Sequence, residues 1–340
     1  MVLPFIWYVL IGVLIAGYAL LDGFDLGVGM LFPFITKTPQ QKAVLRTSIG
    51  PVWDGNEVWL LTAGGALFAA FPAVYATVFS GFYLALMLVL FCLIFRAVSL
   101  EPRAQRTKNT AWDWAFFIGS AVPSLLFGVA IGNIIRGVPI DRDGEFGGTF
   151  FTLLNPFSLL IGVFGLVMLL THGAAWIALR TEGALQKRGA RVLSVVHWLF
   201  VALFVVTTVV AVTTQTDQAK RVVGNPLGWI MIVIVLAGLV LTRVSIARKR
   251  DGYAFIGSAL DILGLVGLMA VGNYPSLVPA INDSERSLTV SNASSSHLTL
   301  MVMGIIALIG VPIVLAYTAL VYSKFKGRIS SASTEGYGAE

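Results

Sequence analysis

The chain has 340 residues, of which 57% are hydrophobic and 12% charged, and its formal net charge at pH 7 is +6. A soluble domain needs far more polar surface, so this composition excludes a soluble globular protein and predicts an all-α integral membrane protein with many spans. Cys92 is the single cysteine, which excludes disulfides within the chain and cysteine-rich metal or iron–sulfur sites.

Nine apolar runs approach the length of about 20 residues that a helix needs to cross a bilayer. They lie at 5–33, 49–71, 75–98, 112–135, 156–181, 192–213, 227–247, 253–273 and 297–322. Pro72 separates the second run from the third, which predicts a tight antiparallel hairpin there. We expect one transmembrane domain over 1–326, followed by a disordered cytoplasmic tail over 327–340, where Ser and Gly are common.

The basic residues predict the orientation of these spans. Seventeen Lys and Arg lie in one set of connections and five in the opposite set, in alternation through nine spans. Cytoplasmic loops carry the excess of Lys and Arg, so the N-terminus is expected outside and the C-terminus in the cytoplasm. Since the positive charge belongs to these loops, no nucleic-acid partner is expected.

The most informative stretch is 48–72, SIGPVWDGNEVWLLTAGGALFAAFP. It is an apolar span, yet Asp54, Asn56 and Glu57 lie in its first third. Placing acids in hydrocarbon is costly, so these side chains are expected to face the protein interior or water. Membrane proteins keep such groups for moving protons, ions or substrate, or for a structural ion pair.

Further ionisable groups are predicted at the same depth, in the cytoplasmic half of the first four spans. The first span carries Asp22 and Asp25, the third ends near Arg96, and the fourth begins near Asp113. Asp22 is close enough to the interface to be solvated. We therefore expect the first four helices to share a polar cytoplasmic end.

Two interpretations of this cluster compete. In the structural one, Arg96 pairs with Asp113 or Asp54, and the acids lock the helices together. In the functional one, carboxylates and water form a proton route from the cytoplasm. We favour a structural role for Arg96 and Asp113. For Asp25, Asp54 and Glu57 we favour the proton pathway.

Other polar residues in the spans are interpreted as packing residues. Asp261 in the eighth span stands apart and is expected to be hydrogen-bonded, and Trp59 is expected to pack between helices. Three histidines, His172, His197 and His297, lack metal-type spacing. Haem needs axial His or Met ligands, so we expect no haem, metal or other cofactor and no catalytic residue in this chain.

Two further classes of protein fit the acids in part. An ion-coupled secondary transporter would use them for coupling, but transporters place such sites near the bilayer midplane within paired repeats. Here the acids gather at one end of the helices. A purely structural assembly subunit would use them only for buried bonds.

Several motifs resemble subunit II of the cytochrome bd quinol oxidases. The strongest are LLDGFDLGVGML and IGPVWDGNEVWLLTAGGALFAAFPAVYATVFSGFY. The later runs FRAVSLEPR, AWDWAFFIGSAVPSLLFGVAIGN, TLLNPFSLLIGV and NASSSHLTLMVM resemble the same family. The resemblance therefore extends over nearly the whole chain.

This resemblance implies two four-helix bundles plus a peripheral helix in the bacterial cytoplasmic membrane. It implies a complex that oxidises quinol and reduces O2 to water with cytoplasmic protons, in which subunit I holds two b-type haems and one d-type haem. It also implies small single-helix accessory subunits, and a quinone or lipid that this chain could bind.

For individual residues, the resemblance implies a proton-channel role for Asp25 and Asp54. It implies a buried stabilising pair of Arg96 and Asp113, and a place for Trp59 near an apolar route for O2.

Overall fold

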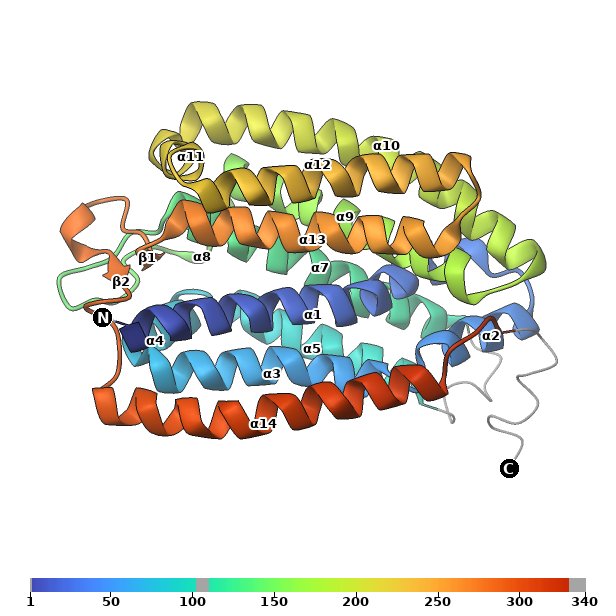
Figure 1. Ribbon diagram of the computed structural model, residues 1–340, viewed down its shortest axis with the longest axis horizontal. Coiled ribbons are helices and arrows are strands. Elements are labelled where there is room, and N and C mark those ends of the chain that lie inside the picture. The colour runs from blue at the N-terminus through green and yellow to red at the C-terminus, as the bar shows by residue number, and fades with distance from the viewer. Residues whose placement is uncertain (1, 102–109, 330–340) are drawn as a thin grey trace.

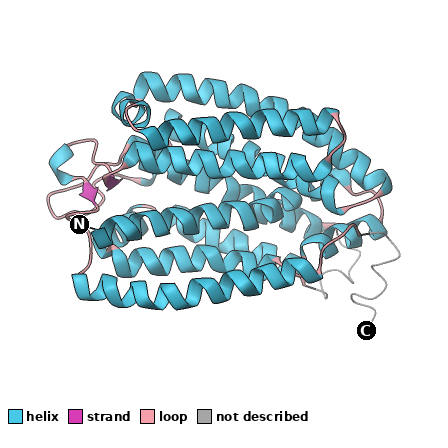
Figure 2. Cartoon of the chain, viewed as in Figure 1, coloured by secondary structure: helices cyan, strands magenta, loops and turns pink. Residues whose placement is uncertain are grey.

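The computed structural model describes residues 2–101 and 110–329, which are helical apart from short loops and one small two-stranded sheet (Figures 1 and 2). The elements are α1 (Val2–Ile35), α2 (Pro39–Ile49), α3 (Trp53–Ala70), α4 (Pro72–Gly81), α5 (Tyr83–Leu100), α7 (Ala111–Arg136), α8 (Phe150–Leu153), α9 (Pro156–Arg180), α10 (Gly183–Thr214), α11 (Thr216–Val223), α12 (Pro226–Ala247), α13 (Asp251–Asn273), β1 (Ser276–Val278), a 3₁₀ turn (Ser284–Arg286), β2 (Leu288–Thr289) and α14 (His297–Lys324).

Eight helices of the described chain are long and apolar enough to cross a membrane, namely α1, α5, α7, α9, α10, α12, α13 and α14. Each overlaps a predicted span, so the prediction of an all-helical integral membrane protein is confirmed. The remaining predicted span, 49–71, corresponds to α3. This helix has 18 residues but is not among the eight, because Asp54, Asn56 and Glu57 in its first turns lower its mean hydropathy.

The third predicted span, 75–98, is wrong at its start because the structure divides it into α4 and α5. The helix breaks at Phe82, which takes φ −97° and ψ 13°. Phe146, from the loop after α7, lies against the break: a Cβ added to Gly81 would lie 2.6 Å from its Cγ. A side chain distant in sequence therefore occupies the space that a side chain at position 81 would use.

The predicted spans did not include several helical segments, among them α2, α8, α11 and the first part of α10. Pro39 begins α2, whose N-cap is Thr38, and this helix carries basic residues between α1 and α3. The predicted span 192–213 begins earlier, because α10 starts at Gly183 and buries Leu185 beside the helices around α1.

The long helices pack around α1, which contacts α3, α7, α9 and α13. In Figure 1, α10, α12 and α13 lie on one side of α1, and α3 and α14 lie on the other. Gly27 of α1 and Gly173 of α9 let two backbones touch: a Cβ on Gly27 would lie 2.7 Å from the Cα of Gly173. Small residues permit such close crossings in lipid.

The last helix, α14, is almost entirely exposed and is held near its ends. Trp7 donates from Nε1 to the carbonyl of Leu300 at 3.0 Å. At the other end, Arg180 of α9 donates to the carbonyls of Phe325 and Gly327. The first residues of the predicted tail are therefore bonded to α9, and 330–340 lie outside the described residues.

Candidate functional site

A buried ion pair joins α1 to α5. Arg96 and Asp22 are both 0% exposed. Arg96 Nη1 donates to Asp22 Oδ2 at 2.7 Å, and Nη2 bonds the other carboxylate oxygen, so the pair is bidentate. Glu57 of α3 lies 3.4 Å from Arg96 Nη1 and keeps 23% of its side chain exposed. The Arg96 guanidinium of α5 therefore contacts acids from α1 and α3. Its single positive charge cannot balance the two negative charges of these acids.

The predicted pair of Arg96 and Asp113 is wrong, as is the prediction that Asp22 is solvated. Asp113 bonds Lys42 and also Arg46, whose Nη2 lies 3.2 Å from it. Both cations come from α2, which sequence patterns did not reveal. Burial lowers the pKa of Arg46, whereas the Asp113 carboxylate raises it. Since α2 neutralises Asp113, Arg96 is left to bond the buried acid of α1.

Asp25 lies one turn further along α1 and is also fully buried. Its Oδ2 accepts a hydrogen bond from Asn56 Nδ2 at 2.8 Å. Its Oδ1 is buried and has no hydrogen-bond partner among the described residues. The carboxyl is thus held by one oxygen, while the other remains available for a proton or water.

Asn56 of α3 connects this acid to α14. Its Nδ2 also donates to the carbonyl of Leu21 at 3.0 Å, and its Oδ1 accepts from the hydroxyl of Tyr322 at 3.0 Å. Sequence reasoning noted Asn56 between two acids but gave it no role, and it missed Tyr322. An amide inside an apolar span was the available signal for Asn56, because a buried amide needs partners.

The other predicted residues of α3 do not join this cluster. Asp54 is exposed on the outer side of α3. Trp59 lies against α1: a Cβ added to Gly17 would lie 3.0 Å from the Cδ2 atom of its ring. The structure therefore places Trp59 in a packing contact, and it brings together only Asp25 and Glu57 of the three predicted proton-pathway acids.

The histidine in α9 is part of the helix packing. His172 is fully buried, with Nδ1 2.7 Å from the hydroxyl of Ser258 and Nε2 3.1 Å from the carbonyl of Leu20. Both ring nitrogens are therefore engaged by the protein itself, and none is free to bind haem iron. In the chain as described, no group of three or more His, Cys, Asp or Glu could hold a metal ion.

Asp261 lies at the contact of α12 and α13, against Gly238. It is buried, and neither carboxyl oxygen has a hydrogen-bond partner within 2–101 and 110–329. The prediction that it is hydrogen-bonded is wrong. Close approach of the α12 backbone at Gly238 leaves the carboxyl packed without a donor.

The fold and this site define an integral membrane protein of long packed helices, in which ionisable side chains gather inside one part of the helix assembly. The family model for cytochrome bd terminal oxidase subunit II matches residues 3–325. The chain belongs to this family, and it is thus a subunit of a membrane oxidase.

Similar proteins carry the same description. The chain is 40% identical over 361 residues to a probable cytochrome oxidase subunit 2 of Haemophilus influenzae, covering 97% of this chain and 96% of that protein. It is 39% identical over 368 residues to the cytochrome bd-I ubiquinol oxidase subunit 2 of Escherichia coli K12, covering 98% and 97%. A cytochrome bd ubiquinol oxidase subunit 2 of Bacillus subtilis is 35% identical over 329 residues, with 96% of each chain covered.

A solved structure has the same fold. The bd oxidase from Geobacillus thermodenitrificans contains a chain that matches with a TM-score of 0.79 at 16% identity, covering 96% of this chain and 99% of that one. Membership of this family gives no support to the alternative interpretation of the chain as an ion-coupled transporter.

Proposed function

We propose that this chain is the haem-free second subunit of a quinol oxidase in the bacterial cytoplasmic membrane. Its partner, subunit I, would hold the b- and d-type haems and carry out quinol oxidation and O2 reduction. Support comes from the family and from relatives that are ubiquinol oxidase subunits. Both ring nitrogens of His172 are hydrogen-bonded within this chain, so this histidine is not available as a haem ligand. This agrees with haem binding in the partner subunit.

The proposal includes nine membrane crossings, with α3 as the second. A helix of 18 residues is about 27 Å long, which is close to the hydrocarbon thickness. The proposal groups α1, α3, α4–α5 and α7 as one four-helix bundle and α9, α10, α12 and α13 as the other, with α14 as the peripheral helix; the contacts of α5 with α7, of α9 with α10 and of α12 with α13 support this grouping. The basic helix α2 and the end of α14 would face the cytoplasm, with the N-terminus outside.

Within this assembly, we assign proton access from the cytoplasm to Asp25, with Glu57 beside it. The observation that carries this assignment is the buried carboxyl of Asp25, bonded through one oxygen while the other is free. Two carboxyls, those of Asp22 and Glu57, contact one guanidinium, and the carboxyl of Asp25 lies one turn along α1 from Asp22. Excess negative charge is costly in such surroundings, so an exchangeable proton is the natural counter-charge.

We assign Asp54 a proton-pathway role as well, on a different face of α3 from Asp25. Its side chain is exposed on α3, so a proton path through it would run along the outside of this chain against the partner subunit. For Trp59, an O2 route would require the ring to control access, and Trp59→Ala would then change the KM for O2. A packing role would change stability instead.

The test substitutes Asp25→Asn, which preserves size and removes the exchangeable proton. Quinol oxidase turnover should fall about tenfold or more, since proton transfer by a positioned side chain contributes about 10²–10⁴-fold to rate. Complex yield and haem content should stay near those of the unmodified complex. Asp113→Asn is the matched control, because that acid is buried in an ion pair away from Asp25.

Loss of haem in proportion to activity would assign a structural role to Asp25 and support an assembly subunit. Purification of the tagged chain in mild detergent tests the complex itself. A larger subunit with b- and d-type haem bands should co-purify, and a colourless preparation would refute the proposal. Mass spectrometry of the same sample reports single-helix accessory subunits and bound quinone or lipid.

A further inference from the structure

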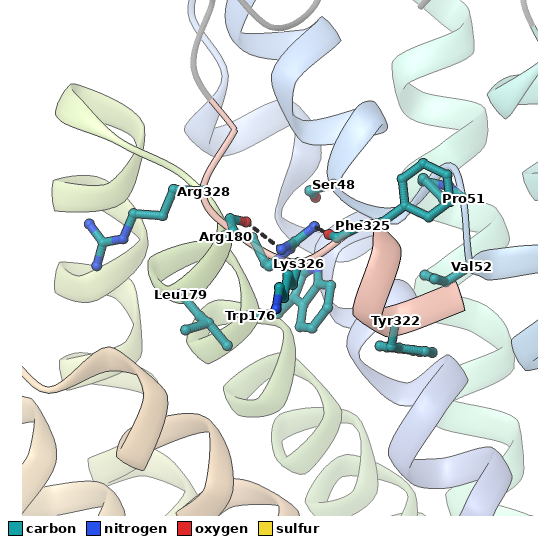
Figure 3. A pocket seen from close by; sticks show the side chains of 11 residues that line it. Ser48, Pro51, Val52, Trp176, Leu179, Arg180, Tyr322, Phe325, Lys326 and Arg328 are labelled. Carbon is teal, nitrogen blue, oxygen red and sulfur yellow. Dashed lines mark hydrogen bonds between the residues drawn. The ribbon is translucent and has the colours of Figure 1, made fainter. Parts of the chain in front are cut away.

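A cavity of about 390 Å³ opens where α9 and α14 end, and Figure 3 shows its walls. We call it the α9–α14 cavity. Its lining comes from the end of α2 and the residues that follow it, from the last turns of α9, and from the end of α14 with the residues after it. None of the proposed proton-pathway acids lines it. Pockets of about 300–1,000 Å³ commonly hold small organic ligands, so this cavity is large enough to be a binding site.

The cavity lies where the helices leave the hydrocarbon. Arg180 is the last residue of α9, and Trp176 lies about 6 Å deeper along the helix axis, because four residues rise by that distance. Tyr322 occupies the last turn of α14. Trp, Tyr and basic residues gather at membrane–water interfaces, the level at which lipid headgroups lie. The position of the cavity therefore matches the headgroup region of one leaflet.

The cavity carries positive charge that no acid of the described chain balances. Arg180 lines it, is 9% exposed, and bonds the carbonyls of Phe325 and Gly327, as the dashed lines in Figure 3 show. Carbonyl groups accept these bonds but carry no net charge. Lys326 also lines the cavity and is exposed. Neither cation pairs with a carboxylate among residues 2–101 and 110–329.

Other cations at this end of the molecule do have acidic partners. Arg328 pairs with Asp251 at 2.8 Å. Lys42 and Arg46 of α2 both bond Asp113. The unbalanced charge is thus concentrated at the α9–α14 cavity. A charge in poorly hydrated surroundings is costly unless a counter-charge approaches it, so an anion is the expected occupant.

The walls of the cavity select among anions. They are largely apolar, and the apolar side chains that line them are Pro51, Val52, Trp176, Leu179 and Phe325. A free phosphate ion gains nothing from such walls, whereas a hydrocarbon chain is removed from water against them. Basic pockets between transmembrane helices bind the headgroups of anionic lipids in this way. The lining therefore fits a ligand with an anionic head and an apolar body.

We propose that the α9–α14 cavity binds the phosphate headgroup of an anionic phospholipid of the phosphatidylglycerol type. Lys326 contacts the phosphate, Arg180 supplies a fixed positive charge beside it, and the apolar walls hold the first carbons of an acyl chain. The bound lipid ties the end of α14 to α9 and to the segment between α2 and α3. This inference goes beyond the proposed function and does not depend on the proton role of Asp25.

Photolabelling of the purified, delipidated complex in mild detergent tests the site. The probe is phosphatidylglycerol with a diazirine on its acyl chain next to the glycerol, and mass spectrometry of peptides locates the adducts. We expect adducts on the segments 48–52 and 322–328, which line the cavity. Unlabelled phosphatidylglycerol should compete for these positions, whereas zwitterionic phosphatidylcholine and inorganic phosphate should not.

Variants of one lysine test the role of charge. Lys326→Gln should lower labelling of these segments about fivefold, the size expected for one basic side chain near an anionic lipid, and Lys326→Arg should retain it. Lys324→Gln is the matched control, because this lysine is exposed two residues earlier and lies outside the cavity lining. Leu179→Trp fills the cavity without changing its charge and should also lower labelling. Complex yield and the haem spectrum verify assembly of each variant.

The inference is overturned if the assembled complex gives no adduct on these segments, or if Lys326→Gln and Lys324→Gln label equally. Competition by inorganic phosphate as strong as that by phosphatidylglycerol would overturn the assignment to a lipid, and equal competition by phosphatidylcholine would overturn the role of charge. The turnover of Asp25→Asn tests the proposed function separately, so either proposal can fail while the other stands.

Discussion

Replacing Asp22 with asparagine should strongly destabilise the chain, although the substitution hardly changes the size of the side chain. Arg96 is fully buried and donates both terminal nitrogens to Asp22. An asparagine offers one acceptor oxygen, and its amide N–H groups then face the second guanidinium nitrogen, donor against donor. One bond is lost and a buried positive charge loses its main partner.

The expected cost follows from the geometry of the pair. Breaking a buried ion pair by removing one partner costs about 3–5 kcal/mol. A hydrogen bond to a charged group contributes about 1.5–3 kcal/mol, and this pair contains two. Glu57 remains 3.4 Å from Arg96 Nη1 and compensates in part. We therefore expect a loss of about 3 kcal/mol.

The assay is the apparent Tm of the purified complex at one fixed scan rate, together with the yield of assembled complex. Asp261→Asn is the matched control, because the same change is made at a buried carboxyl that has no hydrogen-bond partner among the described residues. Asp22→Asn should lower the Tm by several degrees, and Asp261→Asn should leave it nearly unchanged. Combining Asp22→Asn with Arg96→Gln should recover part of the loss, because the unpaired charge is gone.

Equal Tm values for Asp22→Asn and Asp261→Asn would refute this reasoning, because they would show that Arg96 does not depend on its partner. A double variant that loses as much as the two single variants together would refute it as well. That result would mean that the two side chains act independently.

Three further predictions concern other contacts. Asp113→Asn should lower the free energy of unfolding by about 1 kcal/mol at low salt and by less at high salt, because its two cationic partners from α2 are partly exposed. The Tm measured at both salt concentrations checks this, and a salt-independent loss would contradict it. Gly27→Ala should reduce complex yield, since its Cβ would lie 2.7 Å from the α9 backbone, whereas Gly12→Ala meets nothing within 4 Å and should be neutral. Arg180→Lys cannot reach both carbonyls that the guanidinium bonds, so trypsin should cleave the end of α14 faster than in the unmodified complex.

Part of the site was predictable from the sequence because ionisable residues are expensive in a membrane and therefore conspicuous. Asp25, Glu57 and Arg96 could be identified in this way. Their partners could not. Whether Arg96 bonds Asp113 or Asp22 depends on the rotation of each helix about its axis and on a helix, α2, with no apolar run to reveal it.

The sequence by itself determined the class of protein and the places of most membrane helices. Hydrocarbon forces each crossing segment to satisfy its own backbone hydrogen bonds, so a long apolar run can form only a helix there. The tertiary structure decided where a helix breaks and which side chains meet. Phe146 lies against the break at Phe82, and Tyr322 reaches Asn56 across 266 positions of sequence. Such contacts follow from packing between distant segments, and no local pattern of residues encodes them.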